Sequence, residues 1–315
     1  MKYAKDRIMK SSHTGEVLTE ALPWIKIATG KTVVIKYGGA AMVDTKLRDA
    51  VMSDIVMLKI MGMNPVIVHG GGAAISENME RFGLPVEFKN GQRVTTDEAM
   101  DIVKMTLIGK VNEELVLAVN AHGNLAVGVN GADAGTLTAV QKSADLGRVG
   151  TVTDVDPTYI QALIAADYIP IVATVAKGED GGSYNVNADA AASALAAALG
   201  AHKIIYLTDV DGFYEDFSDK DSLVSQMSLA ETRAMLAEGK VSKGMIPKLQ
   251  SCVASLEAGV PRAHIVNGTK PHSILIELLT TGGSGTLIHE DESSHVSLDD
   301  MAPLGNLASR LTENR

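Results

Sequence analysis

Short aliphatic runs and amphipathic stretches alternate along most of this chain. The run TVVIK (32–36) leads into a glycine turn and a helical stretch, and PVIVH (65–69) repeats this order. Aliphatic runs without polar alternation are typical of strands buried on both faces, and strands alternating with helices predict a parallel sheet. We therefore expect an α/β fold, a three-layer αβα sandwich with a central, mostly parallel sheet. The expected strands span residues 32–36, 65–69, 125–130, 136–140, 149–153, 169–174, 203–208, 263–266 and 285–288.

Turn and cap signals divide the segments between these strands. Gly200 is placed to end an Ala-rich helix, and Ser228 with Glu231 has the pattern of a capping box. Asn90-Gly91 predicts a hairpin turn, whereas the Gly- and Asn-rich residues 177–187 predict a loop. The expected helices span residues 45–61, 157–166, 188–199, 229–238, 245–258 and 272–279, with two more within 97–121.

The first 29 residues predict an amphipathic helical extension. Apolar residues lie among charges in this segment, and we expect a break in the helix near Ser11–Gly15. Its apolar stripe must be covered either by its own domain or by a second subunit. The remaining length allows one large α/β domain or two lobes, followed by a polar tail after residue 290.

Composition and charge narrow the classes of function. The chain is 46% hydrophobic, and its net charge of −10 argues against a nucleic-acid binder, which needs a basic surface. Cys252 is the only cysteine, so neither an intrachain disulfide nor a cysteine-built metal site is possible. No apolar stretch is long enough to span a bilayer, and the N-terminus lacks the apolar core of a signal peptide. We expect a soluble cytoplasmic protein that binds no membrane.

Two glycine clusters follow the first two expected strands. They are Lys36-Tyr37-Gly38-Gly39 and His69-Gly70-Gly71-Gly72, and the common phosphate motifs, the Walker A loop and G-x-G-x-x-G, are absent. Glycines at a helix start let backbone N–H groups approach an anion. One such turn could equally be an ordinary tight turn. Two of them, with a lysine ending the strand, favour phosphate binding.

Four charged residues lie at expected strand ends or helix starts. Lys36 and Asp209 each follow a strand, while Asp189 and Lys248 each begin a helix. Each alone fits an ordinary surface, turn or capping role. Because the carboxyl ends of parallel strands meet at one edge of a sheet, the set together indicates phosphoryl transfer.

Taken in order, six segments of the chain resemble the amino-acid kinase family. The resemblance covers about residues 31–290, and it is strongest to the arginine-inhibited branch that phosphorylates N-acetyl-L-glutamate. The strand-lysine-glycine pattern is shared across the family, whereas NGQRVT and NVNAD indicate this substrate. The segments are VVIKYGG (33–39), VIVHGGG (66–72), NGQRVT (90–95), NVNADAAASALAAALG (185–200), YLTDVDG (206–212) and KGMIPK (243–248).

The resemblance implies a division of labour along the chain. Residues 1–30 would form an oligomerisation helix, 31–200 a lobe for the acyl amino acid, 201–290 a lobe for ATP and arginine, and 291–315 a tail. Lys36 and Lys248 would hold the transferring phosphoryl group, and Asp189 would lie between them and orient both. The residues implied for the acyl amino acid are Gly71, Gly72, Arg93 and Asn185. The residues implied for ATP are Lys36, Gly38, Gly39, Thr208, Asp209, Tyr214, Lys243, Gly244, Met245 and Lys248.

The implied chemistry is direct in-line transfer from MgATP to a carboxylate. Gly39 and Gly71 would offer backbone donors to the transferring group. A carboxylate is already ionised at pH 7, so no general base is needed. Mg²⁺ would be bound through phosphate oxygens and waters, and no metal-ligating cluster of side chains is expected.

The same branch implies regulation and assembly. His264, Glu277 and Gly283 match positions that hold the feedback inhibitor L-arginine. The N-terminal helix would interlace dimers into a hexamer, a trimer of dimers.

Two alternatives stay open. The chain could be a related kinase of aspartate, glutamate or carrier-linked aminoadipate, or a non-catalytic arginine sensor on the same fold. Arg93 favours N-acetyl-L-glutamate over the first alternative. The joint presence of Lys36, Asp189 and Lys248 argues against the second.

Overall fold

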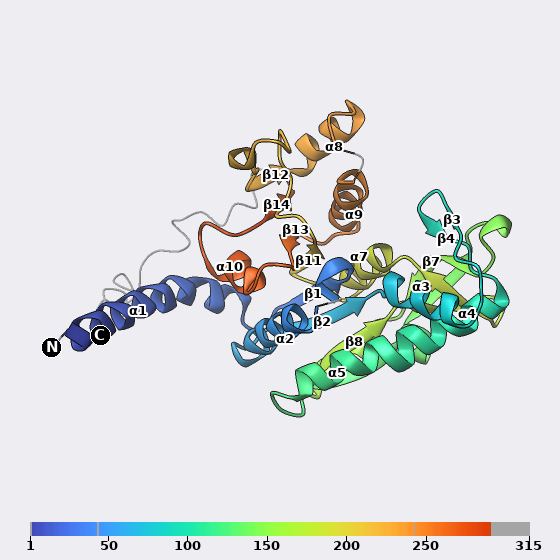
Figure 1. The fold of residues 1–315 in the computed structure, drawn as a ribbon, viewed down its shortest axis with the longest axis horizontal. Helices are drawn as coiled ribbons and strands as arrows, with labels where there is room; N and C mark the ends of the chain where they lie inside the picture. Colours follow the sequence, from blue (N-terminus) through green and yellow to red (C-terminus); the bar gives the residue numbers. More distant parts are fainter. Residues whose placement is uncertain (1, 43, 243, 291–315) are drawn as a thin grey trace, which may run out of the picture.

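An eight-stranded sheet forms the middle layer of the molecule (Figure 1). The computed structural model describes residues 2–42, 44–242 and 244–290, except for the side chains of residues 2–13, 16, 40 and 41. The strand order is β12-β14-β13-β11-β1-β2-β8-β5, and each neighbouring pair in it is parallel except β13 with β14. The predicted α/β class and mostly parallel sheet are confirmed. The strands are β1 (Thr32–Tyr37), β2 (Asn64–His69), β5 (Ala126–Asn130), β8 (Ile169–Ala173), β11 (Lys203–Thr208), β12 (Gln226–Ser228), β13 (Arg262–Asn267) and β14 (Thr286–His289).

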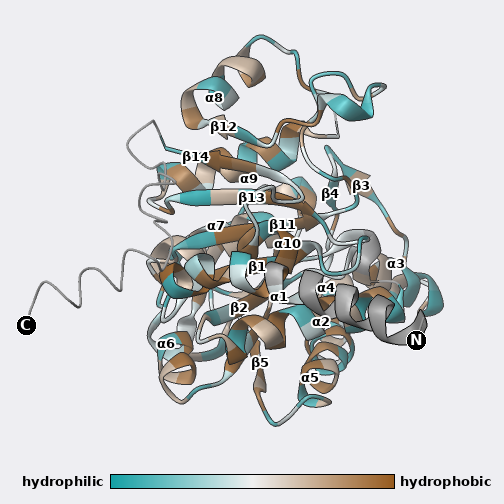
Figure 2. Ribbon diagram, turned by 90° about the vertical axis from the view of Figure 1, so that its left-hand side faces the viewer, coloured by the Kyte–Doolittle hydropathy of each residue, from teal (hydrophilic) through white to brown (hydrophobic). Residues whose placement is uncertain are grey.

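Helices cover both faces of this sheet, which is why its strands are aliphatic throughout. Successive strand residues point to opposite faces. Val34 accordingly shares a buried cluster with residues of α7 and α9, whereas Val33 and Ile35 share one with residues of α2 and α5. Figure 2 shows hydrophobic segments along the central strands and hydrophilic ones on the outer turns. The helices are α2 (Thr45–Ile60), α3 (Gly72–Arg81), α6 (Thr158–Ala165), α7 (Ala188–Ala198), α8 (Leu229–Ala237), α9 (Ile246–Glu257) and α10 (Ser273–Leu279).

The sheet is built from two halves that are contiguous in sequence. Residues 31–200 supply β1, β2, β8 and β5, and residues 201–290 supply β11, β13, β14 and β12. The halves meet where β1 pairs with β11, with Lys36 opposite Tyr206. The central strand β1 therefore lies at the junction of the two lobes.

A small closed barrel stands beside the first lobe. It consists of β6 (Leu137–Gln141), β7 (Val149–Val155), β9 (Val175–Gly178) and β10 (Ser183–Val186). The expectation of a loop at 177–187 is therefore wrong, because β9 and β10 pair as a hairpin there. Tyr184 and Val186 are buried in that hairpin, whereas their neighbours are half-buried. Buried and half-buried residues alternate along β10, as is typical of a strand, but the glycines just before it favoured a loop in the sequence.

The predicted hairpin at Asn90-Gly91 is present. It joins β3 (Phe88–Lys89) to β4 (Gln92–Arg93), and both turn residues have positive φ angles, +50° and +76°. These angles suit the tight two-residue turn that Asn-Gly favours. The turn brings Arg93 back opposite Phe88.

The N-terminal extension is one continuous helix, α1 (Lys2–Ala28), which projects from the body (Figure 1). The predicted break near Ser11–Gly15 is wrong. A single glycine costs a helix only about 1 kcal/mol, and here the Gly15 carbonyl accepts a bond from the Thr19 hydroxyl. Trp24 packs on the core at the helix end, whereas Leu18 is 61% exposed. No helix in the described ranges is long and apolar enough to cross a membrane.

One long helical rod replaces the two helices expected within 97–121. It begins with α4 (Asp97–Lys104), continues as a π-helix over Met105–Asn112, and ends with α5 (Glu113–Asn120). Wide π-helical turns are rare and are frequent near functional sites. The middle of this rod, called here the π segment, packs under the second glycine loop.

Candidate active site

Lys36 and Asp189 form an ion pair at the carboxyl end of β1. The Lys36 Nζ lies 2.9 Å from the Asp189 Oδ1, and the two side chains are 16% and 26% exposed. Asp189 stands in the first turn of α7, where the Asn187 side chain caps the helix by accepting bonds from the N–H groups of Asp189 and Ala190. The structure thus brings these two predicted residues together and holds the ammonium in one direction.

The Lys36 ammonium occupies the space where a side chain at Gly38 would begin. A Cβ atom there would lie 2.9 Å from the Lys36 Nζ. Gly39 follows with a φ of +72°, in the left-handed region that glycine adopts without strain. The Lys36 ammonium therefore lies over its own glycine turn, next to backbone groups that can meet an anion.

The second glycine loop lies beside the first because β1 and β2 pair in register. Tyr37 is opposite His69, and the Gly70 N–H donates to the Tyr37 carbonyl at 3.3 Å. A Cβ at Gly71 would come within 2.7 Å of the Leu107 Cδ2. Helix α3 begins at Gly72, so its first unpaired N–H groups belong to this loop. Both glycine loops thus share one edge of the sheet.

A cavity of about 370 Å³ opens beside the second loop. We call it the Arg93 cavity, and it gathers all four residues predicted to hold the acyl amino acid. Lys142 and Phe88 also face it, although sequence reasoning missed both. The lining residues that matter for the argument are Gly71, Gly72, Phe88, Arg93, Lys142 and Asn185.

Arg93 is fixed within this cavity and is only 6% exposed. One terminal nitrogen donates to the Gly72 carbonyl and to the Ser76 Oγ, each at 2.7 Å, and the guanidinium lies 4.8 Å from the Phe88 ring centroid. Burial lowers the pKa of Arg93. Because guanidinium has five N–H groups, donors remain for a carboxylate.

A second cavity, of about 680 Å³, lies in the other lobe. We call it the Asp209 cavity. Five of the residues predicted for ATP line it, whereas Thr208 is not among the lining residues and instead bonds the backbone of Val210. Lys243 lies outside the described residues. The lining residues predicted from the sequence are Asp209, Tyr214, Gly244, Met245 and Lys248.

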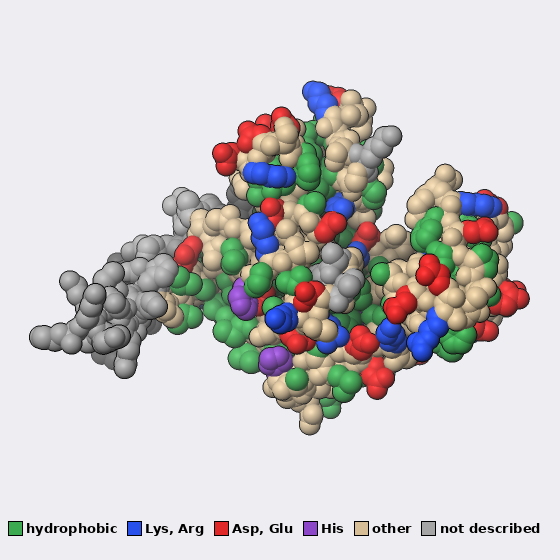
Figure 3. Space-filling model, in the orientation of Figure 1, with side chains coloured by type: hydrophobic (Ala, Val, Ile, Leu, Met, Phe, Trp, Pro, Cys, Tyr) green, Lys and Arg blue, Asp and Glu red, His purple; other side chains and the backbone are tan. Residues whose placement is uncertain are grey.

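The structure pairs Asp189 with Lys36 and Lys248 with another carboxylate, so the position of Asp189 between the two lysines stays a prediction. Lys248 pairs with Asp209, at 3.9 Å, and its ammonium donates to the Gly244 carbonyl at 3.3 Å. Lys248 lies in the first turn of α9, next to the loop after β11 that carries Asp209. Figure 3 shows a deep notch between the part carrying α8 and α9 and the part carrying the β3–β4 hairpin.

The loop after β11 is tied to the loop after β13. Asp211 accepts hydrogen bonds from the Tyr214 hydroxyl and the Asn267 side chain, both at 2.8 Å, and forms an ion pair with Lys270 at 2.6 Å. Tyr214 therefore reaches the Asp209 cavity with its hydroxyl group already bonded. Asp211 is a further residue that sequence reasoning missed.

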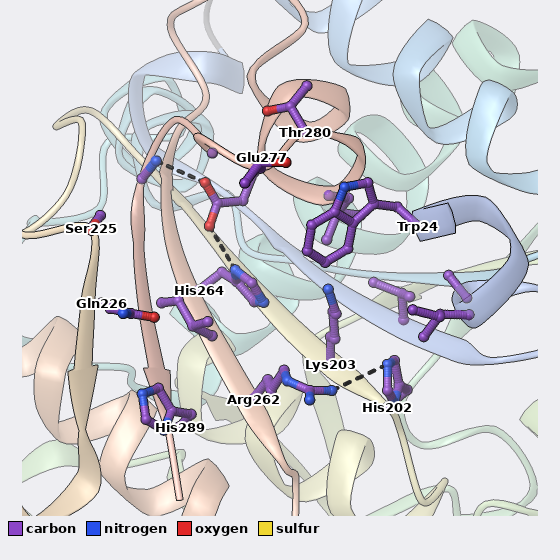
Figure 4. Close-up of a pocket in the computed structure, with 18 of the residues that line it drawn as sticks. Trp24, His202, Lys203, Ser225, Gln226, Arg262, His264, Glu277, Thr280 and His289 are labelled. Atoms are coloured by element: carbon purple, nitrogen blue, oxygen red, sulfur yellow. Dashed lines mark hydrogen bonds and ion pairs between the residues drawn. The ribbon is translucent and has the colours of Figure 1, made fainter. Parts of the chain in front are cut away.

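A third cavity, of about 380 Å³, shares no lining residue with the other two, and Figure 4 shows its walls. We call it the Glu277 cavity. It brings together His264, Glu277 and Gly283, the three residues predicted for arginine. The Glu277 carboxylate accepts from the His264 Nδ1 at 2.7 Å and from the N–H groups of Ser284 and Gly285. A Cβ at Gly283 would lie 2.9 Å from the Glu277 Oε2, so a side chain there would press on the carboxylate.

Two polar atoms of the Glu277 cavity are buried without a hydrogen-bond partner among the described residues. They are the Trp24 Nε1 and the His264 Nε2. Because a carboxylate only accepts, the His264 Nδ1 carries the proton, and burial lowers the pKa of His264, which leaves Nε2 as an acceptor. Lys203 adds a cation to the same wall, and burial lowers its pKa to about 8. The cavity therefore offers both donors and acceptors to a ligand.

Comparisons with known proteins agree with this geometry. The sequence model of the amino acid kinase family matches residues 31–267. The chain belongs to this family and is an ATP-using kinase.

Relatives within the family are more specific. The acetylglutamate kinase of Bifidobacterium animalis subsp. lactis is 50% identical over 286 residues, which cover 88% of this chain and 93% of that protein. The acetylglutamate kinase of Caldanaerobacter subterraneus is 47% identical, covering 91% and 95%. The predicted resemblance to kinases of N-acetyl-L-glutamate is confirmed.

Solved structures give the same fold. An N-acetylglutamate synthase from Neisseria gonorrhoeae, complexed with coenzyme A and N-acetyl-glutamate, superposes with a TM-score of 0.76 at 25% identity. The match covers 88% of this chain and 63% of the synthase. A carbamate kinase from Giardia lamblia bound to AMP-PNP shares the fold, with a TM-score of 0.61 at 19% identity over 84% of this chain and all of that one.

We predict that Gly38→Ala lowers the kinase turnover number about 10²-fold without changing the melting temperature. The added methyl group would displace the Lys36 ammonium, and misplacement by about 1 Å can cost that much. Gly15→Ala, where a Cβ meets nothing within 4 Å, is the matched control. Equal turnover in the two variants would show that the ammonium position is unimportant.

Proposed function

We propose that this kinase phosphorylates the γ-carboxylate of N-acetyl-L-glutamate with MgATP, giving N-acetylglutamyl-5-phosphate in arginine biosynthesis. The observation that carries the proposal is the Arg93 cavity, which joins a fixed guanidinium to the second glycine loop. An acidic acyl amino acid placed there would have one carboxylate on Arg93 and the other facing the loop. The acetylglutamate kinase relatives support the same substrate.

Transfer in this site would need positioning and charge neutralisation, and no proton acceptor. The substrate carboxylate is ionised at pH 7 and attacks directly, in line with the leaving oxygen. Lys36, held by Asp189, would neutralise charge from the first lobe, and Lys248 would do so from the second. The N–H groups of Gly39 and Gly71 would donate to the transferring phosphoryl oxygens.

The Asp209 cavity would hold ATP. Its mixture of aromatic, backbone and cationic groups suits a base and a phosphate chain, with Lys248 at the phosphate end. Among the described residues no group of three or more His, Cys, Asp or Glu side chains could hold a metal ion. Mg²⁺ would therefore be held mainly by phosphate oxygens and waters, with Asp209 nearby, and would neutralise phosphate charge.

The Glu277 cavity would bind L-arginine as a feedback inhibitor. Arginine carries a guanidinium, a carboxylate and an ammonium group. The His264 Nε2 and the Glu277 carboxylate would meet its cationic groups, and Lys203 with the Trp24 N–H would meet its carboxylate. Because Trp24 belongs to α1, arginine would contact the helix that we expect to join subunits.

The assembly we propose is a cytoplasmic hexamer, a trimer of dimers linked by α1. Among the described side chains of α1, those that pack on the core lie near its end, from Ala21 on, whereas Val17, Leu18 and Leu22 are 44%, 61% and 42% exposed. An exposed apolar row of this kind fits a second subunit. A ring would let one arginine site influence several active sites.

Replacing Lys36 or Lys248 by alanine should lower the turnover number about 10²-fold or more, with smaller changes in KM. Each ammonium would act mainly on charge in the transition state. ADP release with N-acetyl-L-glutamate measures the effect, and the exposed Lys177→Ala is the control. Wild-type turnover in either active-site variant would refute its role.

Arg93→Lys should raise the KM for N-acetyl-L-glutamate about 10-fold or more and leave the KM for ATP unchanged. Lysine keeps the charge but loses the forked donor pair.

The wild type should also release ADP with N-acetyl-L-glutamate about 10²-fold faster than with aspartate or glutamate at equal concentration. A higher KM for ATP would place Arg93 on the nucleotide side, and a preference for aspartate or glutamate would make the chain a sister kinase.

Glu277→Gln should raise the arginine concentration for half-inhibition about 10-fold or more and leave uninhibited turnover intact. The amide would need its oxygen for the N–H groups of Ser284 and Gly285, so its NH₂ group would face His264 and force the proton to Nε2. That change removes the acceptor proposed for arginine. Unchanged inhibition would exclude the cavity as the arginine site.

A further inference from the structure

His69 ends β2 directly before the second glycine loop and is fully buried. Its Nδ1 lies 2.9 Å from the Gly70 carbonyl oxygen, and its Nε2 lies 3.0 Å from the Asn112 Nδ2. The His69 carbonyl accepts a bond from the Thr174 hydroxyl at 3.1 Å. The residue is thus bonded through both ring nitrogens and its backbone, yet the transfer chemistry described above does not use it.

These partners define one tautomer. A carbonyl oxygen only accepts, so the His69 Nδ1 carries a hydrogen and donates it to Gly70. The Asn112 Nδ2 donates one hydrogen to the Ile171 carbonyl, at 2.8 Å, and the other to the His69 Nε2. The imidazole is therefore neutral. Burial lowers the pKa of His69 to about 4, and the bond to Gly70 only partly opposes this shift.

The π segment supplies Asn112 and also contacts both the loop and the helix α3 that follows it. Asn112 is 5% exposed, and a Cβ at Gly128 would lie 2.1 Å from its Oδ1, so the amide is enclosed on that side. Thr106 accepts a bond from Asn78 of α3, at 2.9 Å. Leu107 packs against Gly71. The wide turns of the segment thus direct several side chains to the loop from one stretch of helix.

We infer that His69 and Asn112 are positioning residues that fix the peptide groups of the Gly70–Gly72 loop for phosphoryl transfer. The inference rests on the proposed role of this loop as a donor to the transferring group. The Asn112 amide holds the imidazole, the imidazole holds the Gly70 carbonyl, and the Gly70–Gly71 peptide carries the Gly71 N–H. A shift of this peptide moves a donor that would act on the transition state.

Asn112→Asp tests the chain of bonds with almost no change in shape. A carboxylate cannot donate to the neutral His69 Nε2 or to Ile171, so turnover should fall about 10²-fold at pH 8.5, with less than about a 3-fold change in the KM for ATP. The introduced carboxylate would also raise the pKa of His69. Below that raised pKa the imidazolium donates from both nitrogens, which restores the bond. Turnover relative to wild type should therefore recover about 10-fold as the pH falls from 8.5 to 6.

Asn120→Asp is the matched control on α5. Asn120 mainly accepts, from the N–H groups of Leu125 and Ala126, and a carboxylate can still do so. It should keep wild-type turnover and wild-type pH dependence. Gly128→Ala provides an uncharged second variant, because its methyl group would push the Asn112 amide away from His69. It should lower turnover about 10-fold or more at every pH between 6 and 8.5, without recovery in acid.

The outcomes are distinct. If Asn112→Asp and Gly128→Ala both turn over like wild type, or lose only melting temperature, the inference is overturned. A fall in Asn112→Asp without recovery in acid overturns the assigned tautomer. If the wild type accepts a different acidic amino acid, the proposed substrate fails, and the same variants are compared on the accepted substrate. Loss of turnover with acid recovery in Asn112→Asp alone, beside a normal Asn120→Asp, supports the inference.

Discussion

The ion pair between Lys36 and Asp189 is the contact on which the arrangement of this site depends. It joins the end of the central strand β1 to the first turn of α7, at 2.9 Å. For Lys36 to emerge there, the strand before it must be aliphatic on both faces, and Gly38 must leave room for the ammonium. For Asp189 to meet it, α7 must begin at the Asn187 cap. Strand, turn and helix start are thus coupled by one contact.

The junction of β1 with β11 explains how two cavities from different halves of the chain could serve the one reaction proposed above. The Arg93 cavity belongs to the first half of the sheet and the Asp209 cavity to the second. Lys36 stands where the halves meet. Within the second half, Asp211 binds residues at the end of β13 and in the loop that follows it. That loop leads into α10, the helix that carries Glu277. Contacts of Asp211 therefore link the loop that lines the Asp209 cavity to the segment that leads to the Glu277 cavity.

Most of the sheet could be predicted from the sequence because its aliphatic strands and glycine turns leave few other options. The same argument placed Lys36 and Asp189 near the carboxyl edge, where the structure has them, whereas Arg93 was found only through the resemblance to the family. It did not show that Lys248 pairs with Asp209, because the order of strands gives no distances between side chains. It failed for β9 and β10, where glycines masked a period of two.

The π segment escaped prediction for a different reason. Its amphipathic pattern over 97–121 is that of ordinary helix, and the extra width of its turns is set by packing rather than by residue type. His69 was part of the second glycine motif, but nothing in the sequence assigned it a role. The role inferred above depends on its hydrogen bond with Asn112, which lies 43 residues later in the chain. Buried polar pairs of this kind need the folded structure to be seen.

The wide turns also limit how the length of this rod can change. Each residue of an α-helix turns the chain by about 100°. Inserting one residue between Met105 and Asn112 without further widening of the turns would rotate α5 relative to α4 by roughly that angle. Asn112 would then leave His69, and Leu107 would leave Gly71, although no residue of either glycine loop had changed. Insertions should thus be tolerated in the loop at residues 121–125, beyond α5, and excluded from the rod itself.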